Sequence, residues 1–237
     1  MLESGSADLF DKIGTSAYLE FNEAADFIWK SPNFIKYETI IEQRNLTRYF
    51  PENKELQKQR WQLEANKLQK TFPYMIAVGN LFSVLSLFES YLLLLANNLK
   101  PYTRTCVDEQ KGQGVNKLFN YFKSVGIAPS RVALYQQVDA AITIRNCLVH
   151  ASGILSFSRS EAKLKELLKS KNYLSPDAKE RRIKNEDTFD EISIVTSNFG
   201  DRIIISNKYT WLVCAYLSKY FFDLCNSVKE HVQNITL

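Results

Sequence analysis

The chain has 237 residues, of which 45% are hydrophobic and 24% charged, with only 8 Gly and 6 Pro. This composition is typical of a soluble globular chain and excludes the collagen-like, mucin-like and intrinsically disordered classes. The net charge of +4 permits an anionic partner without requiring one, so the position of the charge along the sequence matters more than its sum.

Scarce Gly and Pro, together with long stretches of helical periodicity, predict a mainly helical protein. The first helix is expected over residues 10–29, where a Ser-Pro-Asn turn signal follows, and a second over 52–69. The segment 74–99 is apolar almost all round, as in the central helix of a bundle. Its most apolar part, 81–96, is shorter than the roughly 20 residues that cross a bilayer, so we expect a core helix and no membrane contact.

The second half of the chain predicts shorter elements. Gly112 and Gly114 mark a loop that leads into the first of them. The expected order is helices 115–124, 131–150 and 161–169, strands 191–196 and 202–206, and an aromatic last helix over 209–232. The fold class is therefore mainly α, with a small β-hairpin before the last helix.

Arg145 interrupts the amphipathic pattern of the helix expected over 131–150. At about 100° per residue, it projects from the middle of an apolar stripe. The stripe consists of Leu134, Val138, Ala141, Ile142 and Val149. A buried charge without a partner costs several kcal/mol, so this guanidinium requires an interaction partner. The partner is an anion, a second protein surface, or an intramolecular carboxylate such as Glu89 or Asp139.

Asn146 and His150 lie beside Arg145, on an adjoining face of the same helix. Arg offers a fork of donors that fits a phosphate, and the pKa of an unperturbed His lies near neutrality. These groups suit phosphodiester cleavage without a metal, in which a base takes the proton of a ribose 2′-OH and a cation stabilises the phosphate oxygens. The alternative is a structural role, with Arg145 in an ion pair and His150 favoured by the helix dipole.

The letters RNCLVH at 145–150 resemble the R-N-x-x-x-H form of the signature of HEPN domains. The surrounding sequence is similar as well, with an apolar helix that contains Glu89, a Gly-containing loop before a short helix, and an aromatic last helix. The resemblance implies a HEPN-like four- to five-helix bundle over 71–237, with residues 1–70 as an N-terminal helical extension.

Active HEPN proteins are metal-independent endoribonucleases that act as homodimers, so the resemblance implies RNA as substrate, no cofactor, no metal, and a dimer through the helix that carries Arg145 and His150. Carried over to this chain, Arg145 would hold the scissile phosphate and His150 would act as general base or acid. Asn146 would orient the His or the phosphate, and Glu89 is a further catalytic candidate. Because the chain has only two histidines, a two-histidine site would need a second copy.

The resemblance also suggests a biological setting and its alternatives. A toxin of a toxin-antitoxin pair or an antiviral defence effector, controlled by an inhibitory or effector partner protein, is the leading hypothesis. The second is a non-catalytic HEPN-like module that binds nucleic acid, a nucleotide or a regulatory protein. The third is a helical oligomerisation subunit in which Arg145 forms only a structural ion pair.

Cysteine usage and the start of the chain predict the compartment. The four cysteines lie far apart without a C-x-x-C pair, and the N-terminus is acidic where a secretory signal would be basic. We therefore expect free thiols and a cytoplasmic location.

One basic segment accounts for the positive charge of the chain. Residues 159–184 carry nine basic and four acidic residues, a net +5, which leaves the rest of the chain at −1. Because the segment begins soon after His150, we expect it to contact RNA phosphates beside the cut, although a solvated helix and loop would have the same composition. The RNA-binding candidates are Lys163, Lys179, Arg181, Arg182 and, for base stacking, Tyr173.

Overall fold

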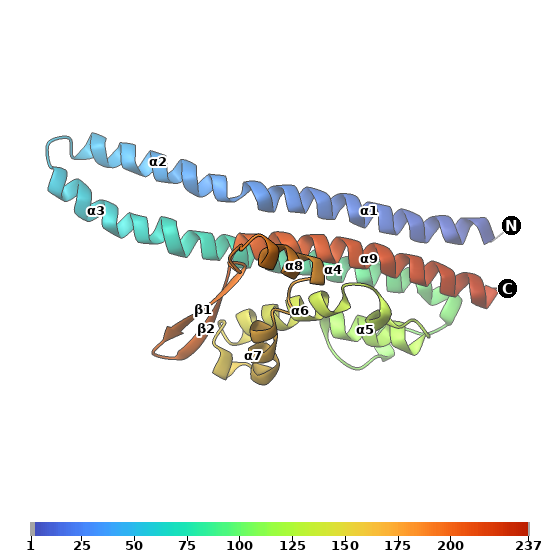
Figure 1. The fold of residues 1–237 in the computed structure, drawn as a ribbon. Coiled ribbons are helices and arrows are strands. Elements are labelled where there is room, and N and C mark those ends of the chain that lie inside the picture. Colours follow the sequence, from blue (N-terminus) through green and yellow to red (C-terminus); the bar gives the residue numbers. More distant parts are fainter. Residues whose placement is uncertain (1–2, 237) are drawn as a thin grey trace.

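A computed structural model describes residues 3–236 of the chain. It confirms the mainly helical prediction, with a two-stranded antiparallel hairpin before the last helix. The longest helices, α1 (Glu3–Lys30), α4 (Phe72–Thr103) and α9 (Asn207–Thr236), lie lengthwise beside one another (Figure 1). Helices α5 (Gly114–Ser124) and α6 (Tyr135–His150) lie on the side of α9 away from α1, and α4 contacts both (Figure 1).

The core lies where α4, α5 and α9 meet. Phe88 of α4 is fully buried, and its ring meets those of Phe119, Tyr220 and Phe221 edge-on, with centroids 6.4, 5.9 and 6.4 Å away. Aromatic pairs of this kind add roughly 0.5–1.5 kcal/mol each beyond the area they bury. Tyr220 and Phe221 of the aromatic last helix are therefore part of the core.

Helix α1 belongs to this core and is not part of a separate extension. It packs along α9, and Phe10, Phe21 and Ile28 are buried in the same hydrophobic cluster as the other long helices. Only α2 (Pro32–Tyr49) and α3 (Lys54–Asn66) project beyond the bundle as a helical arm (Figure 1). Helix α1 thus supplies apolar side chains to the same core as the helices that follow residue 70.

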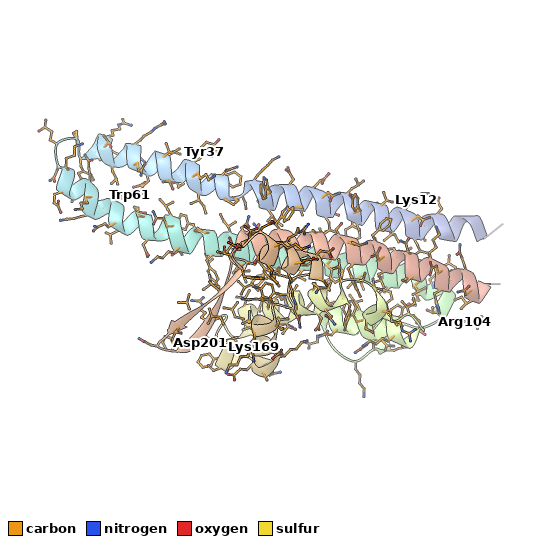
Figure 2. The ribbon with its side chains drawn as sticks, in the orientation of Figure 1. Lys12, Tyr37, Trp61, Arg104, Lys169 and Asp201 are labelled. Carbon is orange, nitrogen blue, oxygen red and sulfur yellow. The ribbon has the colours of Figure 1, made fainter. Side chains whose placement is uncertain are left out.

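The arm is continuous with the central helix. Helix α3 passes through one π-helical turn, Lys67–Thr71, into α4 without a break. Tyr37 and Trp61, labelled in Figure 2, lie on α2 and α3 of this arm. By length and composition alone, the continuous helix Lys54–Thr103 is the one described helix that could cross a membrane. In this helix Leu81 and Leu92 are fully buried, whereas Leu93 and Leu94 are exposed.

The segment between α6 and α9 contains two short helices and the hairpin. These elements are α7 (Glu161–Ser170), α8 (Pro176–Lys184), β1 (Ile192–Ser197) and β2 (Gly200–Ile205). The strands pair from Ile192 with Ile205 to Ser197 with Gly200. No helix was expected between residues 169 and 191, but Ser175 caps α8 by accepting a hydrogen bond from the backbone N–H of Ala178 at 3.3 Å.

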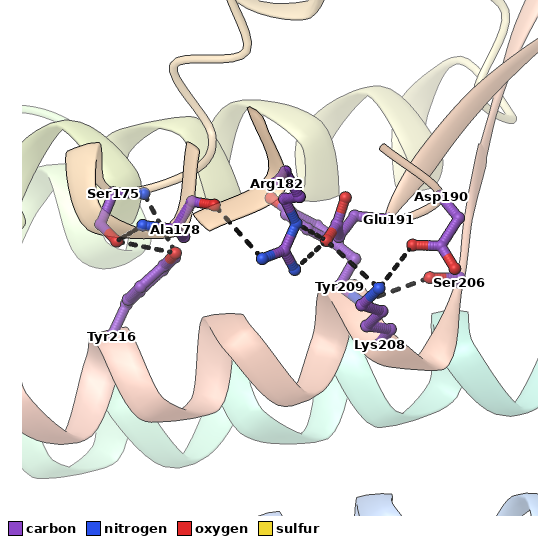
Figure 3. Close-up of polar contacts among 9 residues, drawn as sticks. All are labelled: Ser175, Ala178, Arg182, Asp190, Glu191, Ser206, Lys208, Tyr209 and Tyr216. Atoms are coloured by element: carbon purple, nitrogen blue, oxygen red, sulfur yellow. Dashed lines mark hydrogen bonds and ion pairs between the residues drawn. The ribbon is translucent and has the colours of Figure 1, made fainter. Parts of the chain in front are cut away.

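A buried ion pair holds α8 against the start of the hairpin (Figure 3). The Nε of Arg182 donates to Oε1 of Glu191 at 2.6 Å, and its Nη1 donates to the backbone oxygen of Ala178 at 3.3 Å. Glu191 is fully buried, so removal of the guanidinium leaves its carboxylate with the longer, partly exposed ion pair to Lys208 at 3.9 Å.

Arg182→Ala is therefore expected to lower the free energy of unfolding by about 3–5 kcal/mol, measured by urea denaturation. The matched control is Arg181→Ala, the exposed neighbour, which should change it by less than about 0.5 kcal/mol. Equal effects of the two substitutions would show that the ion pair contributes nothing to stability.

Candidate active site

The four predicted catalytic residues line one groove, which we call the α6 groove. Glu89 comes from α4, and Arg145, Asn146 and His150 come from the second half of α6. The groove has a volume of about 900 Å³. Its remaining wall comes from the loop and first turn of α5 and from the segment that follows α6. The fold thus brings together residues that are far apart in the sequence.

Arg145 has no ion pair among the residues that the structure describes. Its Nη1 donates to Oδ1 of Asn146 at 3.1 Å, and its guanidinium carbon lies 6.0 Å from the centroid of the Phe82 ring. Asp139, one of the two carboxylates considered as partners, instead forms an ion pair with Lys163, with 2.6 Å between Oδ2 and Nζ. Glu89 lines the groove without forming the pair. The structural ion pair is therefore absent from the described chain, and the half-buried guanidinium keeps free donors in the groove.

Asn146 contacts Arg145 directly. Its side-chain oxygen accepts the hydrogen bond from the guanidinium at 3.1 Å, and both side chains line the groove. His150 is the last residue of α6, is exposed, and lines the groove.

The hairpin fixes the end of α6 that carries His150. The backbone N–H groups of Ala151 and Gly153 both donate to the oxygen of Cys147, at 2.9 and 3.0 Å. Gly153 in turn accepts a hydrogen bond from the backbone N–H of Ile203 in β2 at 2.9 Å. A β-carbon at Gly153 would lie 3.0 Å from the Ile203 oxygen, and its φ is +80°, so only Gly fits here. Sequence reasoning predicted the hairpin but not this bracing function.

The start of α5 lies directly against the carboxylate of Glu89. Gly114, the first residue of α5, has a φ of +57°, and a β-carbon there would lie 3.4 Å from Oε1 of Glu89. The preceding Gln113 makes no side-chain capping bond, so the first backbone N–H groups of α5 keep their partial positive charge on the groove wall. Glu89 forms no hydrogen bond or ion pair with any described residue. The groove is therefore rich in donors and has one carboxylate.

Cys147, inside the motif, is a structural residue. Its side chain is buried, and burial raises the pKa of the thiol above its ordinary value, so it stays protonated at neutral pH. All four cysteines are free thiols. In the part of the chain that the structure describes, no three His, Cys, Asp or Glu side chains are grouped so as to hold a metal ion.

The basic segment divides into accessible and buried residues. Lys163 is exposed although paired with Asp139, Arg181 is exposed, and the half-buried Lys179 donates to Oδ1 of Asn172 at 2.6 Å. These three residues remain RNA-binding candidates.

The structure contradicts the RNA-binding roles predicted for Tyr173 and Arg182. Tyr173 is only 1% exposed, and its ring packs edge-on against Tyr209 at 5.8 Å between centroids, so no base can stack on it. Arg182 is only 8% exposed and is bound to Glu191, so it cannot reach a phosphate. Charge counting along the sequence cannot detect such burial, because the pairing partners come from the start of the hairpin and from α9.

Two residues of the α6 groove were missed in the sequence analysis. Arg159 lines the groove and is exposed. Nothing in the sequence distinguishes it from the other basic residues of the 159–184 segment. Phe157 lines the groove beside it, and no pattern in the sequence distinguishes this residue from a core aromatic.

Comparison of the chain with family models, curated proteins and solved structures finds no match in any of the three. Functional inference therefore depends on the α6 groove and on the motif that lines it.

Proposed function

We propose that the chain is a metal-independent endoribonuclease of the HEPN type that acts as a homodimer. The observation that carries this proposal is the placement of Arg145 in the α6 groove without a carboxylate partner in the described chain, beside His150. A phosphate bound there would supply the missing anion and accept the free donors of the guanidinium.

The chemistry that fits these groups is transesterification by the ribose itself. His150 takes the proton of the 2′-OH, and the 2′-oxygen attacks phosphorus while the bond from phosphorus to the 5′-oxygen breaks. Arg145 stabilises the extra negative charge on the phosphate oxygens, and Asn146 holds the guanidinium in position. The products are a 2′,3′-cyclic phosphate and a free 5′-hydroxyl, which requires a proton for the leaving oxygen.

A second copy of the chain would provide that proton. His150 is the histidine that the described residues place in the α6 groove, and one imidazole cannot be base and acid in the same step. Val149 and His150 are both exposed at the C-terminal end of α6, so two α6 helices can approach there. The same histidine of the second copy would then protonate the 5′-oxygen.

The nature of the cut tests the proposed reaction. A short RNA that the protein cuts at one position is compared with the same RNA carrying a single 2′-deoxynucleotide on the 5′ side of that position. We expect the cut to disappear from the substituted RNA and the normal product to end in a 2′,3′-cyclic phosphate. Cutting at the substituted position would contradict attack by the 2′-OH.

The accessible basic residues provide a separate prediction. Changing Lys163, Lys179 and Arg181 to Gln in one variant should weaken RNA binding. The slope of log K against log[salt] should become shallower by about 0.7 for each single-strand phosphate that is no longer neutralised. Anisotropy of labelled RNA measures this in the His150→Ala background, where no cutting interferes. The control replaces three exposed basic residues of the arm, Lys36, Arg44 and Lys58. An unchanged slope would remove the segment from the binding site.

A ribonuclease of this type damages the cell that makes it, which suits a toxin or a defence effector controlled by a partner protein. A non-catalytic module with the same groove would bind RNA without turnover, so the cleavage experiments separate the two functions.

A further inference from the structure

Phe157 stands in the wall of the α6 groove with 62% of its surface exposed. It is the only Phe, Tyr or Trp among the described residues that line this groove. Tyr173, the aromatic residue predicted to stack on a base, is buried elsewhere, so Phe157 occupies the place where a stacking residue would be needed.

The backbone around Phe157 is held from both sides. Leu155, at the start of the same 3₁₀ turn, is 2% exposed and anchors the turn in the core. The N–H of Phe157 donates to the oxygen of Ile154 at 3.2 Å, and that of Ser158 donates to Leu155 at 3.0 Å. Ile154 is bridged to Arg202 of β2. The ring is therefore presented to solvent from a fixed base, which limits the entropy lost when a flat ligand covers it.

The neighbours of Phe157 define the ligand. Arg145, Arg159 and His150 line the same groove, and the two guanidinium groups are suited to phosphate. A nucleotide whose base is unstacked fits this arrangement. Its phosphate would lie on the two guanidinium groups, and the flat face of its base would lie on the phenyl ring of Phe157. In a duplex the bases stack on one another and are not available to the ring.

We propose that Phe157 stacks on a nucleobase beside the phosphate held by Arg145, and that the substrate of the α6 groove is therefore single-stranded RNA. This inference rests on the proposed function, because it takes the bound phosphate to be the one that is cut. Phe157 is then a specificity residue, and Arg159 contacts a flanking phosphate.

Binding in the His150→Ala background tests the stacking, with a labelled single-stranded RNA of mixed sequence and the same RNA in a duplex as probes. Phe157→Ala and Phe157→Leu should each weaken single-strand binding by about 5- to 150-fold, as expected for the loss of one stacked base. Phe157→Trp should retain binding, and its fluorescence should be quenched by the single strand. Duplex binding should be weak and should not change. Phe199→Ala, at the exposed tip of the hairpin and outside the groove, is the matched control.

Three results would overturn the stacking. Binding by Phe157→Leu as tight as that of the parent protein would contradict it, since a merely apolar contact tolerates this change. A parallel reduction in affinity for the single strand and the duplex would equally contradict it. Conversion of a dimer into a monomer by Phe157→Ala, seen by sedimentation, would assign the ring to a subunit interface.

The outcomes also separate this inference from the proposed function. If the wild type cuts RNA through His150 and the Phe157 variants bind normally, the nuclease stands and the stacking fails. If single-strand binding depends on Phe157 but no RNA is cut, the stacking stands and the nuclease fails. If the wild type neither binds nor cuts RNA, both fail.

Discussion

His150→Ala is expected to reduce RNA cleavage by about 10²–10⁴-fold, because it removes the group that accepts the 2′-OH proton. The side chain is exposed at the end of α6, so the melting temperature should stay that of the wild type. Initial rates on a labelled RNA, with thermal unfolding of both proteins, measure the two effects.

The chain offers a matched control for this experiment in its other histidine. His231 lies against Gly126, where its Cε1 would be 3.1 Å from an added β-carbon, and it does not line the α6 groove. His231→Ala should therefore cut RNA at the wild-type rate. Equal losses in the two variants, or full activity in His150→Ala, would show that His150 is not the base.

Arg145→Ala is expected to lower cleavage by about 10²–10³-fold, because the groove loses the donors that stabilise the transition state. Arg145→Lys should recover only part of the rate, since an ammonium keeps the charge but not the fork of donors. Stability should not fall, because no carboxylate in the described chain pairs with this guanidinium. Arg131→Ala, exposed just before α6 and outside the groove, is the control.

Unfolding of Arg145→Ala would instead indicate a structural role for this residue. In that case Arg145→Met, which keeps the length of the side chain, should be folded, and its cleavage rate would decide between the two roles. A folded Arg145→Met that cuts RNA at the wild-type rate would remove Arg145 from the site.

The elements that build the α6 groove were predictable because their signals are local. Helical periodicity identified α6 to within a few residues, and the glycines at 112 and 114 marked the start of α5. Arg145 was detected as a charge within an apolar stripe, and the structure places it in a groove with Glu89 and His150.

The features that were missed depend on contacts between distant segments. Helix α1 joins the core through α9, which comes almost two hundred residues later, so the sequence around residue 20 resembles that of a peripheral helix. The burial of Tyr173 and Arg182 depends on Tyr209 and Glu191 in the same way. Phe157 is exposed because Leu155, two residues earlier, fills the core position. No local pattern distinguishes these alternatives.

The most direct test of the proposed function is cleavage of total RNA by the purified protein in the presence of EDTA, with His150→Ala beside it. We expect the wild type to degrade the RNA equally well with and without EDTA, and the variant to leave it intact. Cleavage that stops in EDTA, or that continues unchanged in His150→Ala, would contradict a metal-independent ribonuclease site in the α6 groove.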